Sequence, residues 1–440
     1  MELLEAFDTY RDIEKAIIIK SDMLRLGTRF SQTALREARK IRNIKVKSYG
    51  LFSYDFGEKV TLASEMVPNS FYLDDGTEDG THVQVRSSPN TPYLIDFVDG
   101  KFPIYWNQEK VGEVLCFEER GKFCNRVMED GTPFEAHVYT CGRDQLFVTA
   151  SKHCDYFSQK KQCLFCDLTT FAGEQKKGGE AMILRKQAEQ VAEIIYAALQ
   201  EKRFRHIMIT GGTFLSKYQG KTEVEWYADF LNTIRKRIWT WYPACLQIGA
   251  LDDEGWKRIH DTGIPCIEPN IEVWGKKLFE IICPGKNEVV GYDNWIKRTV
   301  NAVKYWGPGN VNPNFVIGVE MAQPFGFKRF EDAVKSTLEG FDFLMGNGVL
   351  PRQGDFWCIE SKSELAGQVP PPLEYYLELG KGYLELRYKH GFDHLYVTMC
   401  RNDLGHGTEF DFEYFHGHSS ASREAELKSL ARATSDSGPG

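Results

Sequence analysis

Three cysteines in one short stretch have a spacing suited to binding iron. Cys154, Cys163 and Cys166 form the pattern C-x8-C-x2-C and directly follow Leu146–Ser151, a run that is predicted to be a buried strand. Three thiolates on one loop can each ligate one iron of a [4Fe–4S] cluster, which leaves the fourth iron without a protein ligand. An open iron can bind a small molecule and pass an electron to it, so the spacing points towards redox chemistry.

The same three cysteines could instead hold zinc together with a fourth ligand, or could be buried thiols without a metal. His153 is poorly placed as that ligand, because it is adjacent to Cys154 at the end of a strand and should point to the opposite face. Zinc motifs usually consist of two close pairs, and the second pair is missing here. The cluster is therefore favoured, with zinc as the alternative. Core packing is expected of the other cysteines: Cys116, Cys124, Cys141, Cys245, Cys266, Cys283, Cys358 and Cys400.

From about residue 145 onward the chain alternates strands and helices, which favours an α/β fold with parallel β/α units. The pattern predicts a partial (β/α)6 barrel of the TIM type, with chemistry at the C-terminal ends of the strands. The predicted strands are Leu146–Ser151, His206–Thr210, Leu246–Ala250, Cys266–Val273, Asn314–Met321 and Val349–Phe356. The predicted helices are Arg185–Leu199, Val224–Trp239, Asp253–Thr262, Tyr292–Trp306, Phe330–Met345 and Leu373–Lys389. Phe279–Lys286 is predicted to be a loop without a motif.

Polar and small residues interrupt two of these strands. Gly211 and Gly212 follow the second strand and would let the backbone approach a ligand closely, although a tight turn would use them equally well. Glu268, Asn270 and Glu272 alternate along the fourth strand and should face one side of it. Because unpartnered polar groups are costly inside a barrel, we expect this face to meet a ligand; an outward, solvated face is the alternative.

Composition limits the function classes. The chain has 440 residues, of which 42% are hydrophobic and 26% charged, as in ordinary globular proteins. A net charge of −8 argues against a nucleic acid or an anionic membrane as partner. We expect no membrane span and no secretory leader. Eleven cysteines, an odd number, suit reduced thiols in a cytoplasmic protein better than a disulfide framework.

Three regions are expected along the chain. Residues 1–142 are predicted to form an α+β domain, rich in sheet and of unknown role, which opens with helix up to about residue 45. Asp99-Gly100 between Tyr93–Val98 and Lys101–Trp106 predicts a hairpin. Residues 143–400 should form the barrel. Residues 401–440 should provide a cap and a tail that is expected to be disordered.

The cysteine loop resembles that of the radical SAM superfamily, and in particular its biotin-synthase-like members. Three cysteines follow the first strand of a β/α barrel, and the aromatic Phe165 directly precedes the last of them. The commonest form of the motif is C-x3-C-x2-C, so the first gap here is a variant. The resemblance covers residues 145–400 or so.

This resemblance implies binding sites for S-adenosylmethionine (SAM). The backbone at Gly211-Gly212 would meet the methionyl amine, with Thr213 standing where the family has Glu. Glu272 would reach the ribose. Val316 and Gly318 on the fifth strand would flank the adenine.

The resemblance also implies a substrate side. Asn270 and Arg352 are the candidate catalytic residues, and Glu268 and Gln353 lie beside them in the sequence pattern. An ordinary surface salt bridge is the alternative for Arg352. The expected activity is reductive cleavage of SAM at a [4Fe–4S] cluster, which generates a 5′-deoxyadenosyl radical that takes hydrogen from a small-molecule or carrier-bound substrate. An external electron donor of the flavodoxin or ferredoxin type is implied. The alternative is a binding protein stabilised by zinc or by a cluster, without turnover.

Overall fold

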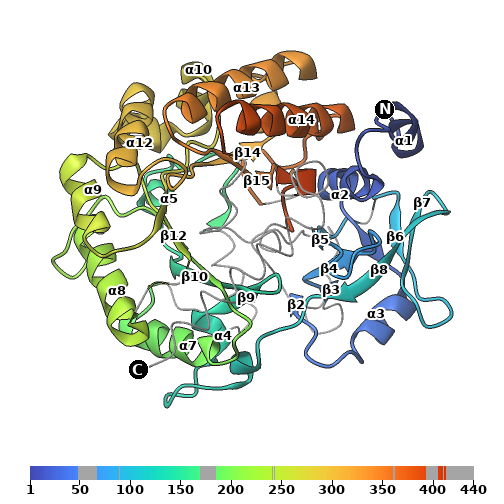
Figure 1. Ribbon diagram of the computed structural model, residues 1–440, viewed down its shortest axis with the longest axis horizontal. Coiled ribbons are helices and arrows are strands. Elements are labelled where there is room, and N and C mark those ends of the chain that lie inside the picture. Colours follow the sequence, from blue (N-terminus) through green and yellow to red (C-terminus); the bar gives the residue numbers. More distant parts are fainter. Residues whose placement is uncertain are drawn as a thin grey trace.

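The computed structural model shows a parallel barrel with an N-terminal sheet beside it (Figure 1). No helix in the described part of the chain is long and apolar enough to cross a membrane. The described residues are 1–47, 67–88, 90–168, 185–239, 241, 243–359, 362–392, 405–409 and 411–412. Most of the predicted C-terminal cap and tail, and Cys400, therefore lie outside the described residues.

The barrel strands pair in the order in which they occur along the chain, and every pair from β10 onward is parallel. Parallel bridges from Ile267 to Val311 and from Glu272 to Phe315 connect β13 to β14. The short strand β9 flanks β10 in the antiparallel sense. The predicted α/β class and partial barrel are thus confirmed. The strands are β9 (Tyr139–Cys141), β10 (Gln145–Ser151), β11 (His206–Gly211), β12 (Ala244–Gln247), β13 (Cys266–Glu268), β14 (Asn314–Ile317) and β15 (Arg352–Phe356).

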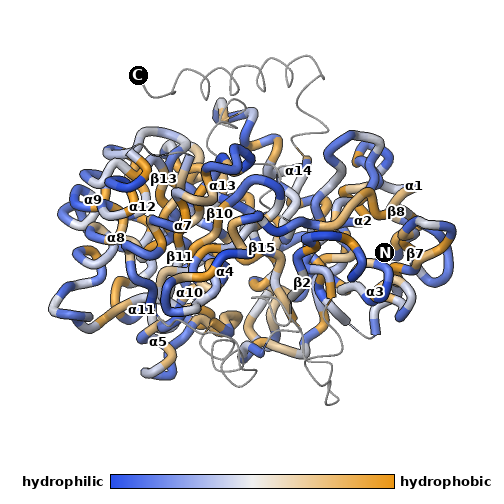
Figure 2. Tube along the Cα trace, turned by 90° about the horizontal axis from the view of Figure 1, so that it is seen from below, coloured by the Kyte–Doolittle hydropathy of each residue, from blue (hydrophilic) through white to orange (hydrophobic). Residues whose placement is uncertain are grey.

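Helices connect these strands and surround them (Figure 1). In α7, Val191, Ile195 and Ala198 recur at helical spacing and are buried against the barrel. Figure 2 shows apolar residues running through the strands, with hydrophilic residues gathered in the outer loops. The helices are α5 (Asp155–Ser158), α7 (Ala188–Leu199), α8 (Glu223–Ile238), α9 (Asp253–His260), α10 (Lys276–Ile282), α11 (Pro284–Val289), α12 (Tyr292–Trp306), α13 (Phe330–Gly346) and α14 (Leu373–Lys389).

Several boundaries differ from the sequence-based expectation. β13 ends at Glu268 and does not extend to Val273, because Pro269 has no amide hydrogen for the ladder and Glu272 adopts a positive φ of 72°. β14 likewise stops before Gly318, whose left-handed conformation starts a 3₁₀ turn. The predicted strands at these two places were therefore too long.

The other differences concern β12, β15 and the expected loop. β12 and β15 are displaced or shortened relative to the predicted Leu246–Ala250 and Val349–Phe356. The segment Phe279–Lys286 is largely helical, because it holds the end of α10 and, after a break at Cys283, the start of α11. Pro284 occupies the first position of α11, where its missing amide hydrogen costs nothing.

The N-terminal region forms a second sheet with strand order β1-β6-β7-β8-β4-β5. The hairpin predicted at Asp99-Gly100 is confirmed, because β6 and β7 pair antiparallel and both turn residues have positive φ. The opening residues are mainly helical, as expected. The elements are α1 (Leu3–Thr9), α2 (Lys15–Leu26), β1 (Arg29–Phe30), α3 (Gln32–Ala38), β2 (Val46–Lys47), β3 (Val67–Pro68), β4 (Ser70–Leu73), β5 (Thr81–Gln84), β6 (Tyr93–Ile95), β7 (Pro103–Trp106), β8 (Glu109–Phe117) and α4 (Phe134–His137).

The N-terminal region contacts both edge strands of the barrel. Arg86, which follows β5, donates to the carbonyl oxygen of Phe356 in β15 at 2.7 Å. On the other side, Lys45 donates to the carbonyl oxygen of Thr140 in β9. Figure 1 shows the N-terminal strands on the side of the molecule where β15 and β9 end the barrel. The N-terminal region therefore bridges the two edge strands of the incomplete barrel.

Candidate active site

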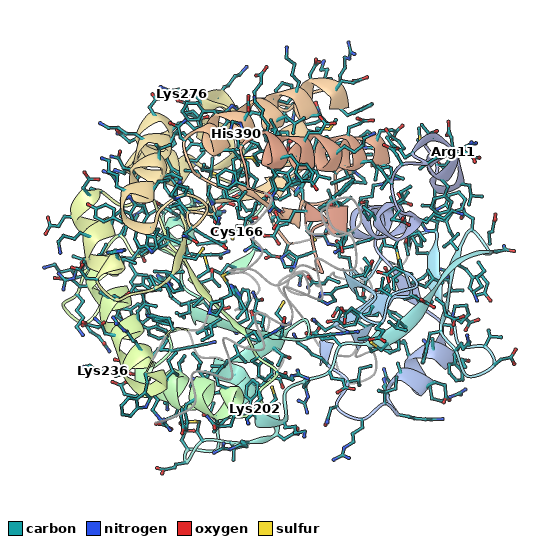
Figure 3. The ribbon with its side chains drawn as sticks, in the orientation of Figure 1. Arg11, Cys166, Lys202, Lys236, Lys276 and His390 are labelled. Atoms are coloured by element: carbon teal, nitrogen blue, oxygen red, sulfur yellow. The ribbon has the colours of Figure 1, made fainter. Side chains whose placement is uncertain are left out.

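The cysteine loop begins where β10 ends, at the C-terminal ends of the barrel strands. Cys154 is buried and directly precedes α5, whereas Cys163 and Cys166 are half-buried. Cys163 is among the electrostatic neighbours that raise the pKa of each of the other two thiols, so the three sulfurs share one region. Figure 3 shows Cys166 inside the ring of barrel helices, while the labelled lysines lie towards the rim.

Burial and nearby backbone amides act in opposite directions on two of these thiols. Burial raises the pKa of Cys154 and of Cys166. The backbone at Thr213 and Tyr156 opposes the rise in the pKa of Cys154, and the backbone at Leu168 opposes it for Cys166, because an amide near a sulfur favours the thiolate. The chemistry of the donors therefore fits a thiolate-bound cluster.

The described residues contain no three His, Cys, Asp or Glu side chains arranged to hold a single metal ion. A cluster makes a different demand on its ligands, because each cysteine binds a different iron and the sulfurs need not converge on one point. The roles of Cys154, Cys163 and Cys166 stay predictions on this basis.

Gly211 and Gly212 let the cysteine loop pack against the end of β11. A Cβ on Gly212 would lie 2.2 Å from the carbonyl oxygen of His153 and 2.5 Å from the Cβ of Cys154. The Gly212 amide donates to the carbonyl oxygen of Ser151 at 2.9 Å. The sequence predicts ligand contact at this pair, but the space beside Gly212 is filled by the cysteine loop itself.

Asp155 connects the cysteine loop to the loop after β11. One carboxylate oxygen accepts from the amides of Leu215 at 2.7 Å and Ser216 at 3.2 Å, and the other lies 2.8 Å from Nε2 of His153. The Asp155 amide donates to the carbonyl oxygen of Thr213 at 2.9 Å. Burial acts to raise the pKa of Asp155, but these bonds outweigh it and hold the pKa below its ordinary value. The predicted SAM-contacting residue Thr213 is thus held beside Cys154.

A fourth cysteine lies against the loop. Cys283 is fully buried at the junction of α10 and α11, and the amide of Leu164, next to Cys163, donates to the carbonyl oxygen of Ile282, next to Cys283, at 2.8 Å. The sequence assigned Cys283 to core packing, because nothing in a single sequence brings it opposite a cysteine 120 positions earlier. Lys286, one turn further along, is among the groups whose charge acts on both sulfurs.

Lys286 forms a buried ion pair with Glu272. Its Nζ lies 2.6 Å from Oε1 of Glu272 and 2.8 Å from the carbonyl oxygen of Asn270, and it sits over the ring of Trp295 at 4.7 Å. Burial raises the pKa of Glu272, and the ammonium group opposes that rise. Burial acts to lower the pKa of Lys286, but Glu272 and the nearby sulfurs outweigh it and raise that pKa.

The three polar residues that were expected on one strand face make separate contacts. Glu268 reaches Arg352 of β15, Asn270 accepts from the amide of Asn314 in β14 at 3.0 Å, and Glu272 reaches α11. Only Glu268 lies in β13, so the regular alternation predicted for the segment is wrong beyond that residue. Each of the three is nevertheless turned towards other elements of the barrel and away from a solvated face.

A chain of hydrogen bonds crosses successive barrel strands. Thr210 donates to Gln247 at 2.5 Å, and Gln247 donates to Glu268 at 2.7 Å. Arg352 then donates to Glu268 at 2.7 Å and to Glu409 at 3.1 Å. Arg352 is 4% exposed and Glu268 fully buried, so the alternatives of a surface salt bridge and a solvated strand face are wrong for these residues.

Val316 and Gly318, the two residues expected to flank the adenine, have different surroundings. Val316 is buried and lies on the same face of β14 as Asn314, because strand residues alternate between faces. The Gly318 amide already donates to Glu320 at 2.9 Å and to the hydroxyl of Tyr375 at 3.0 Å. A Cβ on Gly318 would lie 2.8 Å from Pro371, so protein atoms occupy the space beside this glycine.

Sequence reasoning missed four residues of this site: Cys283, Lys286, Gln247 and Glu409. Gln247 could have been found, because it is a polar residue in an apolar strand and aligns with Glu268 on the neighbouring strand. Glu409 could not have been found, because it follows the last predicted strand by many residues and no local pattern brings it back to the barrel. In the structure it accepts from the amide of Gln353 as well as from Arg352.

Comparisons with known proteins give partial likenesses, and no protein-family model matches the sequence. A bacteriochlorophyllide c C-7(1)-hydroxylase of Chlorobaculum limnaeum is 23% identical over 287 residues, which are 60% of this chain and 66% of that relative. The chain thus spans slightly less than two thirds of the relative's length.

Solved structures are similar over about half of the chain. HydG, a maturase of the [FeFe]-hydrogenase, has a TM-score of 0.37 and 13% identity over 57% of this chain and 52% of its own. Methylornithine synthase (PylB) has a TM-score of 0.34 and 16% identity over 57% of this chain and 70% of its own. In the cysteine loop after its first parallel strand and in the order of its barrel, the chain resembles the radical SAM enzymes.

Proposed function

We propose that the protein is a radical SAM enzyme in which Cys154, Cys163 and Cys166 hold a [4Fe–4S] cluster. The observation that carries the proposal is their common loop, which begins where β10 ends, at the C-terminal ends of the parallel barrel strands. When bound, the cluster and SAM supply reductive cleavage of SAM and a 5′-deoxyadenosyl radical for hydrogen abstraction. The chain contributes binding, orientation and exclusion of water.

Residues around the loop have roles on the SAM side. The backbone at Gly211-Gly212 and Thr213 holds the edge of the loop against β11, next to the site for the methionyl group. Lys286 holds one carboxylate oxygen of Glu272, and this fixes the side chain that would bind the ribose hydroxyls. Val316 supplies an apolar wall. Gly318 acts through the turn that it permits, since its amide is engaged by Glu320.

Residues of the interior chain have roles on the substrate side. Asn270 is held by the amide of Asn314 through its side-chain oxygen, which orients its amide nitrogen. Arg352 is fixed between Glu268 and Glu409, so we assign it to shaping the polar wall of the barrel. The substrate is a small molecule or a carrier-bound group, and an external flavodoxin- or ferredoxin-type donor supplies the electron. A reducing, cytoplasmic compartment suits the odd number of eleven cysteines in the chain.

The test is anaerobic reconstitution of the full chain with iron and sulfide. We expect about four irons per chain and, after reduction with dithionite in the presence of SAM, formation of 5′-deoxyadenosine. Cys163→Ala should abolish both. Cys124→Ala, at a buried cysteine of the N-terminal region, is the matched control and should retain both. Iron binding without 5′-deoxyadenosine would reject the cleavage chemistry.

One observation favours a second candidate, a metal-stabilised binding protein without turnover. Cys283 lies on a segment that is bonded to the cysteine loop through Leu164 and Ile282 at 2.8 Å, and tetrahedral zinc sites commonly use four cysteines. Protein purified without added metal should then be colourless and contain about one zinc per chain. It should also fail to bind SAM in equilibrium dialysis.

A further inference from the structure

Two cysteines lie side by side on neighbouring strands inside the barrel. The sulfur atoms of Cys245 in β12 and Cys266 in β13 are 3.1 Å apart, and each residue is 1% exposed. The two residues are directly paired in the parallel ladder, on the same strand faces as Gln247 and Glu268 two positions later. The contact between the thiols therefore follows from the register of two barrel strands and not from a flexible loop.

Hydrogen bonds hold both sulfur atoms in place. The thiol of Cys245 donates to the sulfur of Cys266, and the thiol of Cys266 donates to Oδ1 of Asn312 at 2.7 Å. The side-chain nitrogen of Asn312 donates to the carbonyl oxygens of Gly309 at 2.9 Å and Leu350 at 3.1 Å, which fixes its oxygen towards the thiols. One end of the thiol pair is therefore anchored to the backbone, and neither sulfur can turn away without losing a hydrogen bond.

This geometry is compatible with a disulfide bond. Neighbouring strands lie about 4.8 Å apart, so the Cα atoms of the pair fall within the range of about 4.4 to 6.8 Å that disulfides span. The sulfur atoms need to approach each other by about 1 Å to reach the bonded distance. Phe147 and Met208 continue the same row on β10 and β11, and the flexible side chain of Met208 can adjust to the movement. Because the Cα separation is at the short end of the range, the bond should be easy to reduce.

We propose that Cys245 and Cys266 are a modification site, at which a peroxide forms a reversible disulfide. Both S–H bonds break and one S–S bond forms. With hydrogen peroxide, the two electrons cleave the O–O bond, and the two protons leave with its oxygens as two molecules of water. A dithiol reductant reverses the step. The inference does not rest on the proposed function, because neither cysteine belongs to the cysteine loop.

Burial controls how fast this pair can react. Burial raises the pKa of Cys245, with Cys266 and Glu268 acting in the same direction and Arg352 opposing them. Since the thiolate is the reactive form, the pair should be oxidised more slowly than the exposed Cys116. Once formed, the bond should stabilise the protein, because it constrains the unfolded chain across the segment between β12 and β13.

The test treats the full chain, freed of iron with a chelator, with hydrogen peroxide. The sample is then alkylated in urea, digested without reductant and analysed by mass spectrometry. We expect a linked pair of peptides containing Cys245 and Cys266, which disappears with dithiothreitol and returns on a second oxidation. The midpoint of urea unfolding should be higher for oxidised than for reduced wild type. Cys245→Ser should lose both the link and the shift, whereas Cys124→Ala, at a buried cysteine of the N-terminal region, should retain both.

Two results would overturn the inference. One is recovery of Cys245 and Cys266 as alkylated thiols, or as separate sulfinic acids, after Cys116 has been oxidised. The other is a bond from either residue to a different cysteine. If Cys245→Ser fails to fold by circular dichroism, the peptide map of wild type decides alone. A wild-type chain that forms the bond but binds no iron on reconstitution would reject only the proposed function.

Discussion

The guanidinium group of Arg352 lies 2.7 Å from the carboxylate of Glu268, inside the barrel and across 84 positions of sequence. Both side chains are almost completely buried. The same guanidinium also contacts Glu409 at 3.1 Å. One cation therefore compensates two buried carboxylates, and burial raises the pKa of Glu409 while Arg352 opposes that rise.

Arg352→Met should destabilise the protein strongly. Removing the cation leaves two buried carboxylates without the positive charge that compensates them, and breaking a buried ion pair costs about 4 kcal/mol in the free energy of unfolding. Urea unfolding measures the loss. Arg329→Met is the matched control, because its ion pair with Glu331 is exposed, and it should change stability little. The stability of Arg352→Lys should lie between those of wild type and Arg352→Met, since lysine keeps the positive charge but lacks the planar guanidinium group that binds two carboxylates. Equal losses in the Arg352→Met and Arg329→Met variants would contradict the buried-charge explanation.

Gly212→Ala should displace the cysteine loop. Its Cβ would overlap backbone and side-chain atoms of His153 and Cys154 that cannot move without shifting the loop. We expect a loss of about 2 kcal/mol in stability and a severalfold drop in iron retained after reconstitution. Gly249→Ala is the control, because its nearest contact would be 3.8 Å away at Trp295, and it should retain iron. Iron retention at the wild-type level in Gly212→Ala would show that the loop tolerates displacement.

Asp155 should make part of the stability depend on pH. Its pKa is lowered in the folded state, because the bonds from Leu215, Ser216 and His153 outweigh the opposing effect of burial. The carboxylate therefore adds stability above its unfolded pKa of about 3.9, and this contribution is lost as the pH falls through the lower folded pKa. Asp155→Asn should be less stable than wild type by about 2 kcal/mol near pH 6.

The two proteins should converge in stability as the pH falls through the lowered folded pKa of Asp155, where the carboxylate becomes protonated in the folded protein as well. Urea unfolding at a series of pH values measures the difference. Asp99→Asn, at the exposed hairpin turn between β6 and β7, is the control and should follow the wild-type profile closely. A gap between wild type and Asp155→Asn that stays constant down to the lowest pH would contradict the assignment.

Asp411→Asn should weaken the attachment of the N-terminal region. The carboxylate of Asp411 lies 2.6 Å from Nζ of Lys20 in α2, and both side chains are nearly inaccessible to solvent. Loss of this charge should cost about 3 kcal/mol and speed hydrogen exchange in α2. Asp12→Asn is the control, because its ion pair with Lys381 also joins the N-terminal region to α14 but is exposed. Similar rates of hydrogen exchange in α2 in the two variants would contradict a larger contribution from the buried ion pair of Asp411 than from the exposed pair of Asp12.

Much of the fold could be predicted because its signals are local. The helices Tyr292–Trp306 and Leu373–Lys389 were predicted to the residue, since apolar periodicity and the flanking Gly307 and Pro372 are read directly from the chain. The strands were located but their ends were not. Whether Leu246–Ala250 or Ala244–Gln247 pairs depends on the neighbouring strands, which no local pattern shows.

For the site, the sequence by itself determined the cysteine triad, the glycine pair and the polar residues after the fourth strand, because each is a matter of residue type and short spacing. Only the tertiary structure decided their partners. The Cys283 segment meets the cysteine loop through Leu164 and Ile282, Lys286 meets Glu272, and Glu409 meets Arg352 across long stretches of chain. Such pairs arise when parallel strands and their crossovers close into a barrel, and the residues carry no mark of this closure in the linear sequence.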